Sequence, residues 1–144
     1  MRYCVSGALT AGEAESLSGT VGYIDLDDDR LAGLISSVRA VAAIDLSAPS
    51  YARVEERVQG HPWHTDEGNK HGGTRGWCRW TAGILLTDPA LFEGGGLSFR
   101  DLGPIFHYLD LWIWSAAGTE HFVASNSGGR KVLIMFFRGG ADGS

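Results

Sequence analysis

The stretch HPWHTD, residues 61–66, places His64 two positions before Asp66. In an extended segment, side chains two residues apart point to the same side, so the imidazole and the carboxylate would face one spot. Two histidines and one carboxylate suit a borderline metal ion such as Fe(II) and leave three coordination positions open. Because a His-x-Asp pair often arises by chance, a metal site here requires a third ligand from elsewhere in the chain.

The candidate third ligand is His121, in the strand-like run EHFV at residues 120–123. Arg130 follows nine positions later, at the start of a strand-like run that continues as KVLIMFF, residues 131–137, and is apolar after Lys131. A buried arginine needs a compensating anion, and its planar fork binds a carboxylate through two hydrogen bonds. A dicarboxylate that chelates the metal at one end would supply that anion at the other.

Alternation along this strand predicts which residues face the pocket. We expect one face to carry Arg130, Val132, Ile134 and Phe136. We expect the opposite face to carry Lys131, Leu133, Met135 and Phe137. Arg130, rather than its cationic neighbour Lys131, is therefore the predicted anion-binding residue.

The first third of the chain has helical patterns. Thr10 followed by Glu13 is a capping-box pattern, which predicts a short helix that ends near Leu17. Three aspartates at 27–29 precede apolar residues at helical spacing, and they predict a second helix from about 28 to 43.

After Pro49 the patterns are strand-like. In residues 51–58 apolar and polar side chains alternate, with Arg53 and Glu55 on the polar side. Further strands are predicted at residues 80–86, 97–99, 106–114, 120–124 and 131–137, with glycine pairs and triples between several of them. Short strands with glycine turns indicate a sandwich or barrel. We therefore predict one domain over residues 1–144, helical over 1–48 and a mainly β barrel over 49–139.

Composition narrows the class of protein. A net charge of -5 argues against a nucleic-acid partner, because phosphate binding usually needs a basic face. No apolar run approaches the roughly 20 residues that a membrane helix requires, and the first residues lack the apolar core of a signal peptide. Cys4 and Cys78 are expected to be free thiols, as in a cytoplasmic protein.

From Tyr51 to Arg138 the chain resembles the Fe(II)- and 2-oxoglutarate-dependent dioxygenases, and within them the prolyl 4-hydroxylase-like group. The resemblance rests on the order and spacing of HPWHTD (61–66), LLTD (85–88), FEGGGLSF (92–99), WS (114–115), HFV (121–123) and GR (129–130). It implies a double-stranded β-helix, a jelly-roll barrel with the N-terminal helices packed on one sheet.

The resemblance also implies roles for individual residues. His64, Asp66 and His121 would bind iron, and Arg130 would bind the distal carboxylate of 2-oxoglutarate. Many relatives add a tyrosine on the strand after the His-x-Asp loop; this chain has TAGIL there, residues 81–85, so Thr81 is the candidate second anchor. The implied reaction uses O2, with ascorbate as a reductant, and hydroxylates a peptidyl proline or similar residue with release of succinate and CO2.

The segment after the metal ligands, EGNKHGGTRGWCR at residues 67–79, is long, polar and rich in glycine. It reads either as a surface loop or as a lid that contacts substrate through Arg75, Trp77 and Arg79. The tryptophans of the β region are assigned to packing rather than to substrate contacts: Trp63, Trp80, Trp112 and Trp114.

Two alternatives remain open alongside peptidyl hydroxylation. The same chemistry would serve a small molecule, such as a free amino acid or a nucleobase. A metal- or sugar-binding β-barrel without oxygenase activity is the third hypothesis, with zinc held by His61, His64 and His71, although Pro62 precludes a helical His-x-x-His site. Arg130 argues against this third hypothesis, because neither zinc nor sugar binding needs it. The substrate and the oligomeric state stay open.

Overall fold

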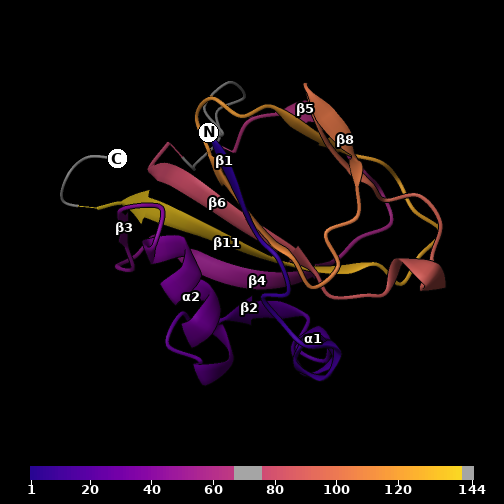
Figure 1. Cartoon of the computed structure of the whole chain (residues 1–144), viewed down its shortest axis with the longest axis horizontal. Helices are drawn as coiled ribbons and strands as arrows, with labels where there is room; N and C mark the ends of the chain where they lie inside the picture. Colours follow the sequence, from indigo (N-terminus) through magenta and orange to yellow (C-terminus); the bar gives the residue numbers. More distant parts are fainter. Residues whose placement is uncertain (67–75, 141–144) are drawn as a thin grey trace.

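Two antiparallel sheets face each other in the computed structural model, which describes residues 1–66 and 76–140 (Figure 1). The larger sheet contains, in spatial order, β1 (Arg2–Val5), β9 (Leu111–Ser115), β6 (Cys78–Leu85), β11 (Lys131–Gly139), β4 (Tyr51–Glu56) and β2 (Gly22–Ile24), and β3 (Ile44–Asp45) pairs with β11. The smaller sheet contains β5 (His61–His64), β10 (His121–Val123), β7 (Leu97–Phe99) and β8 (Leu102–Ile105). The chain is mainly β with a jelly-roll arrangement, as predicted.

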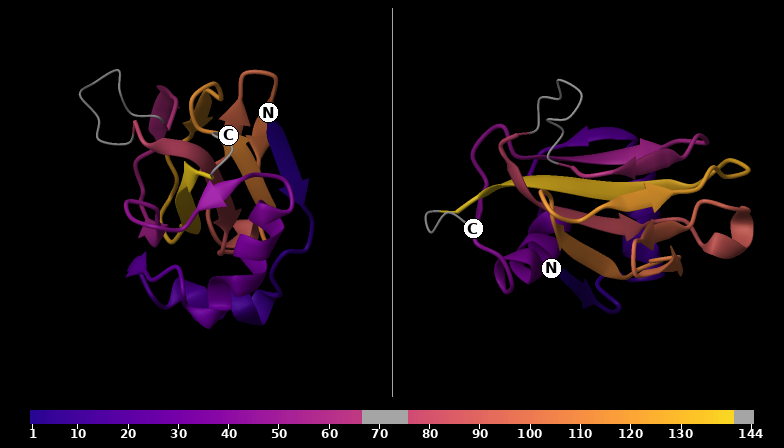
Figure 2. Two further views of the ribbon diagram at one scale, coloured as in Figure 1. Left: turned by 90° about the vertical axis from the view of Figure 1, so that its left-hand side faces the viewer. Right: turned by 90° about the horizontal axis from the view of Figure 1, so that it is seen from above.

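The helices cover the outer face of the larger sheet, away from β5 and β8 (Figures 1 and 2). Helix α1 (Ala11–Ser18) begins with the predicted capping box: Glu13 N–H donates to Thr10 Oγ1 at 3.2 Å, and Thr10 N–H donates to Glu13 Oε1 at 2.9 Å. No helix in the described part of the chain has the length and apolar character needed to cross a bilayer.

The second predicted helix is shorter than expected. A 3-10 turn η1 (Asp29–Leu31), capped by the Asp28 carboxylate, leads into α2 (Ala32–Arg39). The prediction of residues 28–43 was wrong at its C-terminal end, because Ile44 and Asp45 pair with β11 and the chain must leave the helix before them. Another short 3-10 turn, η3 (Pro89–Leu91), follows β6.

The segment 1–48 also contributes strands to the larger sheet. β1 pairs with β9, β2 with β4, and β3 with β11. The N-terminal third is therefore part of the sheet that supports the barrel as well as the helical layer on its outer face.

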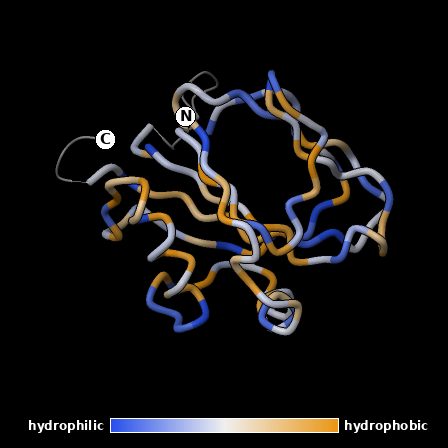
Figure 3. Tube along the Cα trace, in the orientation of Figure 1, coloured by the Kyte–Doolittle hydropathy of each residue, from blue (hydrophilic) through white to orange (hydrophobic). Residues whose placement is uncertain are grey.

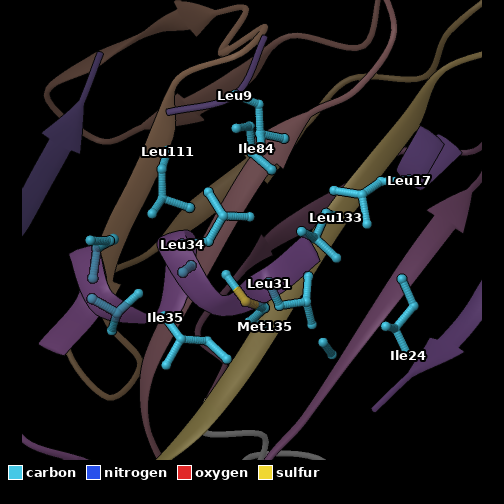
Figure 4. Close-up of a cluster of buried hydrophobic side chains, with 14 of the residues drawn as sticks. Leu9, Leu17, Ile24, Leu31, Leu34, Ile35, Ile84, Leu111, Leu133 and Met135 are labelled. Atoms are coloured by element: carbon cyan, nitrogen blue, oxygen red, sulfur yellow. The ribbon is translucent and has the colours of Figure 1, made fainter. Parts of the chain in front are cut away.

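The main hydrophobic core lies between the helices and the larger sheet (Figure 4). Strand β11 contributes Leu133, Met135 and Phe137 to this core, each buried. β11 extends along the length of the molecule in the right-hand view of Figure 2, and hydrophobic segments follow the larger sheet in Figure 3. The alternate residues of β11 face the interior between the two sheets instead.

The predicted strand at residues 106–114 is interrupted. β8 ends at Ile105 and β9 begins at Leu111, with a turn between them in which Leu109 has a φ of 65°. This left-handed conformation breaks the alternation of side chains that a continuous strand would impose. The prediction of one unbroken strand was wrong, and the turn redirects His107.

Candidate metal centre and its cavity

Three of the predicted residues meet at one point between the sheets. His64, at the end of β5, pairs in register with His121, at the start of β10, and Asp66 follows β5 by two residues. The Nε2 atoms of His64 and His121 each lie 3.4 Å from Asp66 Oδ1. Among the described residues, these three side chains form a group that could hold a metal ion. One ligand atom of each lies within 4.8 Å of the other two.

Backbone contacts orient both imidazoles toward that point. His64 Nδ1 lies 2.6 Å from the Pro62 carbonyl oxygen, and His121 Nδ1 lies 3.2 Å from the Thr119 carbonyl oxygen. Because a carbonyl only accepts hydrogen bonds, these contacts favour the proton on Nδ1 and direct the Nε2 lone pairs toward Asp66. Three electron-pair donors that face one another are stabilised by a cation between them, so the arrangement fits a bound metal ion.

The Asp66 carboxylate is only 3% exposed. Its Oδ2 accepts a hydrogen bond of 2.9 Å from the Trp114 indole Nε1, while Oδ1 faces the two histidines. Burial disfavours the carboxylate, but hydrogen-bond donation from His121, His64 and the Thr81 hydroxyl outweighs burial and holds the pKa of Asp66 below its ordinary value. A metal ion in place of the imidazole protons would act in the same direction. Asp66 is therefore kept anionic where a cation would sit.

The triad opens into a cavity of about 130 Å³ between the two sheets. Strand β11 lines it with Val132, Ile134 and Phe136, whereas Leu133 and Met135 belong to the core. The predicted division of this strand into two faces is confirmed.

Arg130 also lines this cavity and is 6% exposed, whereas Lys131 reaches out to the Ser18 carbonyl. The Nε atom of Arg130 has no hydrogen-bond partner among the described residues. Burial lowers the pKa of Arg130, and the charge of Glu55 opposes that effect. The Arg130 side chain packs directly against Gly95. Any other residue at position 95 would clash with it, because a Cβ there would lie 2.6 Å from Arg130 Cδ.

Strand β4 supplies charged groups that sequence reasoning did not place in the site. Arg53 and Glu55 line the cavity, while Ala52 and Val54 point into the core. Glu55 accepts from Arg53 at 2.8 Å and pairs with His61 Nε2 at 3.2 Å, and the contact with His61 holds the pKa of Glu55 below its ordinary value. The alternation on β4 was visible in the sequence, but nothing in it indicated that the polar face is the inner one.

The other predicted site residues lie apart from Arg130. Thr81 lines the same cavity as Arg130, but it pairs with Phe136, six residues further along the chain, and its hydroxyl interacts with Asp66. Trp77 packs against Tyr51 with ring centroids 5.9 Å apart, and Arg79 is exposed, bonded to the Gly76 carbonyl at 2.7 Å. Arg75 and His71, with most of the predicted lid, lie outside the described residues.

Of the four tryptophans assigned to packing, Trp114 has the additional bond to Asp66. Trp80 packs in the main core, and Trp112 stacks on Phe99 with centroids 5.8 Å apart. Trp63 lies beneath the Arg100 guanidinium, 3.9 Å from its Cζ atom.

Comparison with solved structures identifies this architecture. A prolyl 4-hydroxylase from Pseudomonas putida aligns with a TM-score of 0.70 and 15% identity, over 96% of this chain and 84% of its own. The chain has the prolyl 4-hydroxylase fold. A collagen prolyl hydroxylase of Paramecium bursaria Chlorella virus-1, solved as a 2-oxoglutarate complex, aligns with this chain at a TM-score of 0.69 and 12% identity, over 96% of both chains.

A Trichoplax adhaerens prolyl hydroxylase, solved with a peptide fragment of the hypoxia-inducible-factor oxygen degradation domain, aligns with a TM-score of 0.65 and 13% identity, over 95% of this chain and 83% of its own. No family model matches the sequence, and no curated protein sequence matches it. The likeness is thus one of fold.

Proposed function

We propose that this chain is an Fe(II)- and 2-oxoglutarate-dependent oxygenase. The proposal rests on one observation: a single cavity is lined both by two histidines and a carboxylate that could bind a metal ion and by a buried arginine, Arg130. The Nε atom of Arg130 has no hydrogen-bond partner among the described residues. A metal site alone has no need of Arg130, whereas a dicarboxylate that chelates the metal would reach it. A purely metal- or sugar-binding barrel leaves this arginine without a role.

In this proposal His64, Asp66 and His121 hold the iron, and Arg130 binds the distal carboxylate of 2-oxoglutarate. This donor set suits non-haem Fe(II) and leaves three coordination positions open. With both groups bound, the reaction would couple decarboxylation of 2-oxoglutarate to succinate and CO2 with the transfer of an oxygen atom from O2 to a substrate C–H bond. Trp114 and Thr81 orient Asp66, and the Pro62 and Thr119 carbonyls orient the imidazoles.

A peptidyl proline or a similar peptide residue is the first candidate substrate. The similar folds are those of prolyl hydroxylases, and one of them was solved with a peptide. Ascorbate would act as the reductant that restores the iron.

A small zwitterion such as a free amino acid is the second candidate. It is favoured by the opposite charges that Arg53 and Glu55 place on the cavity wall. The guanidinium would contact a carboxylate and the Glu55 carboxylate an ammonium group.

Succinate release tests the proposal. The purified protein is incubated with Fe(II), 2-oxoglutarate and ascorbate, with proline-containing peptides in one series and free amino acids in another. We expect succinate formation that requires Fe(II) and rises with one of the two series, and that disappears in Asp66→Ala. Succinate release that persists in Asp66→Ala, or its absence with every substrate and without substrate, would contradict the proposal.

A further inference from the structure

Two chain segments flank the C-terminal end of β6 and both line the same cavity. On one side, Leu85 pairs with Val132 of β11, two residues after Arg130. On the other side, Leu85 N–H donates to the His107 carbonyl at 3.1 Å, and Leu109 N–H donates to the Leu85 carbonyl at 3.2 Å. Arg130 and His107 are thereby held on opposite sides of one strand end, and both line the cavity.

The His107 side chain is 4% exposed, and its Nδ1 has no hydrogen-bond partner among the described residues. The imidazole packs beside Gly83 of β6 and near the Trp114 indole: a Cβ at position 83 would be in ordinary contact with both, 3.8 Å from His107 Nε2 and 3.4 Å from Trp114 Cη2. A buried polar nitrogen without a partner costs free energy unless a ligand satisfies it.

The charge state of His107 suits a hydrogen-bond donor. Burial, and to a smaller extent the charge of Arg130, lower the pKa of His107 to about 3. The neutral ring still carries one N–H, so it offers a donor without adding a second positive charge beside Arg130.

The charged side chains that line the cavity carry one more positive than negative charge when Asp66 is set aside. Apart from Asp66 at the metal site, its charged lining residues are Arg53, Arg130 and Glu55. Two cations and one anion are balanced by a single additional carboxylate. Thr81, the anchor expected from sequence, interacts with Asp66 instead.

We propose that His107 and Arg130 together bind the distal carboxylate of the dicarboxylate co-substrate. Arg130 supplies the opposite charge, and His107 donates a ring N–H to the same carboxylate. This inference rests on the proposed function and names the second anchor that the proposed function lacks.

Calorimetric titration of the Mn(II)-loaded protein tests this assignment with two keto acids. 2-Oxopentanoate has the five-carbon chain of 2-oxoglutarate but ends in a methyl group, so it does not engage the anchor. His107→Leu should weaken 2-oxoglutarate binding by about 10- to 100-fold and leave 2-oxopentanoate binding unchanged. His107→Gln, which keeps an N–H donor, should recover part of the loss. Equal losses for both acids, or no loss for either, would overturn the proposal.

Ring-nitrogen NMR of the wild-type protein gives a second readout that does not depend on the stability of His107→Leu. The His107 signals are assigned by their absence from the His107→Gln spectrum. They should shift when 2-oxoglutarate is added to the zinc-loaded protein and stay in place with 2-oxopentanoate, and identical responses to both acids would overturn the proposal.

The same titrations separate two kinds of failure. If Arg130→Leu weakens 2-oxoglutarate binding and His107→Leu does not, the role of His107 is wrong and the proposed function stands. If the wild-type protein binds 2-oxoglutarate neither with nor without metal, both are wrong.

Discussion

The Trp114 indole nitrogen donates a hydrogen bond of 2.9 Å to Oδ2 of Asp66, while the two histidines face Oδ1 of the same carboxylate. This bond connects the larger sheet, through β9, to the loop that follows β5 in the smaller sheet. It fixes the rotation of the carboxylate and thereby selects the oxygen that faces the two histidines.

The first prediction concerns this contact. Trp114→Phe keeps most of the ring packing against Phe99 but removes the donor, so Mn(II) affinity should fall by about 10- to 100-fold. Trp112→Phe is the matched control, because Trp112 lies on the same face of β9, stacks on Phe99 and does not contact Asp66. Calorimetric metal titration of both variants measures the difference, and similar affinities in the two would refute the role of the indole.

The second prediction concerns the ligands themselves. Replacement of His64, Asp66 or His121 by Ala should abolish binding of Fe(II) or Mn(II). His107→Ala should bind metal almost as the wild-type protein does, although His107 is as buried as His121, because it lies outside the ligand group. His61→Ala should also retain metal, since His61 Nε2 pairs with Glu55. Loss of binding in His61→Ala with retention in His121→Ala would require a different metal site.

The third prediction separates two neighbouring cations. Arg130→Leu should weaken 2-oxoglutarate binding by roughly 30- to 1000-fold, because a charge-assisted bidentate contact contributes about 2–4 kcal/mol. Lys131→Leu should change it little, since the Lys131 ammonium group bonds to the Ser18 carbonyl on the outer side of the sheet. Metal affinity serves as the control and should be unchanged in both variants. The reverse order of effects would mean that Lys131, not Arg130, reaches the ligand.

The fourth prediction concerns the pH dependence of stability. The pKa of His107 is lowered to about 3 in the folded protein, against about 6.5 in an unfolded chain. Below pH 6.5 the unfolded state therefore binds a proton that the folded state does not, and stability falls as the pH falls toward 3. Between pH 7 and pH 5 this one residue should cost about 2 kcal/mol.

Urea denaturation of the metal-free wild-type protein and of His107→Gln at both pH values measures this cost. The wild-type protein should lose about 2 kcal/mol more than the variant over this interval. Equal losses would show that His107 is not buried in its neutral form.

Much of the site followed from local periodicity. The side on which Arg130 lies could be predicted because it directly precedes β11, a regular nine-residue strand with one face packed in the main core. The capping box at Thr10 was equally local. The pairing of His64 with His121 could be anticipated only through the resemblance to a known family, since nothing local relates residues 57 positions apart.

The remaining parts depend on tertiary structure that sequence patterns do not encode. In a continuous strand, alternation from Leu111 and Ile113, which face the main core, would put His107 on the core face as well. The left-handed conformation of Leu109 interrupts that strand, and His107 lines the cavity instead. The alternation on β4 did not indicate what its polar face contacts; the second sheet encloses that face, and Arg53 and Glu55 line the cavity. In both cases the surroundings of the side chains depend on segments that are distant in the sequence.

Titration of 2-oxoglutarate into the wild-type protein with and without Mn(II) tests the proposed function at the ligand itself. We expect its metal-chelating end at His64, Asp66 and His121 and its distal carboxylate at Arg130, so tight binding requires both ends. We predict saturable binding with one site per chain in the presence of Mn(II), and binding weakened at least about 100-fold in its absence. Equal affinity with and without metal, or no binding in either case, would contradict the proposed oxygenase function.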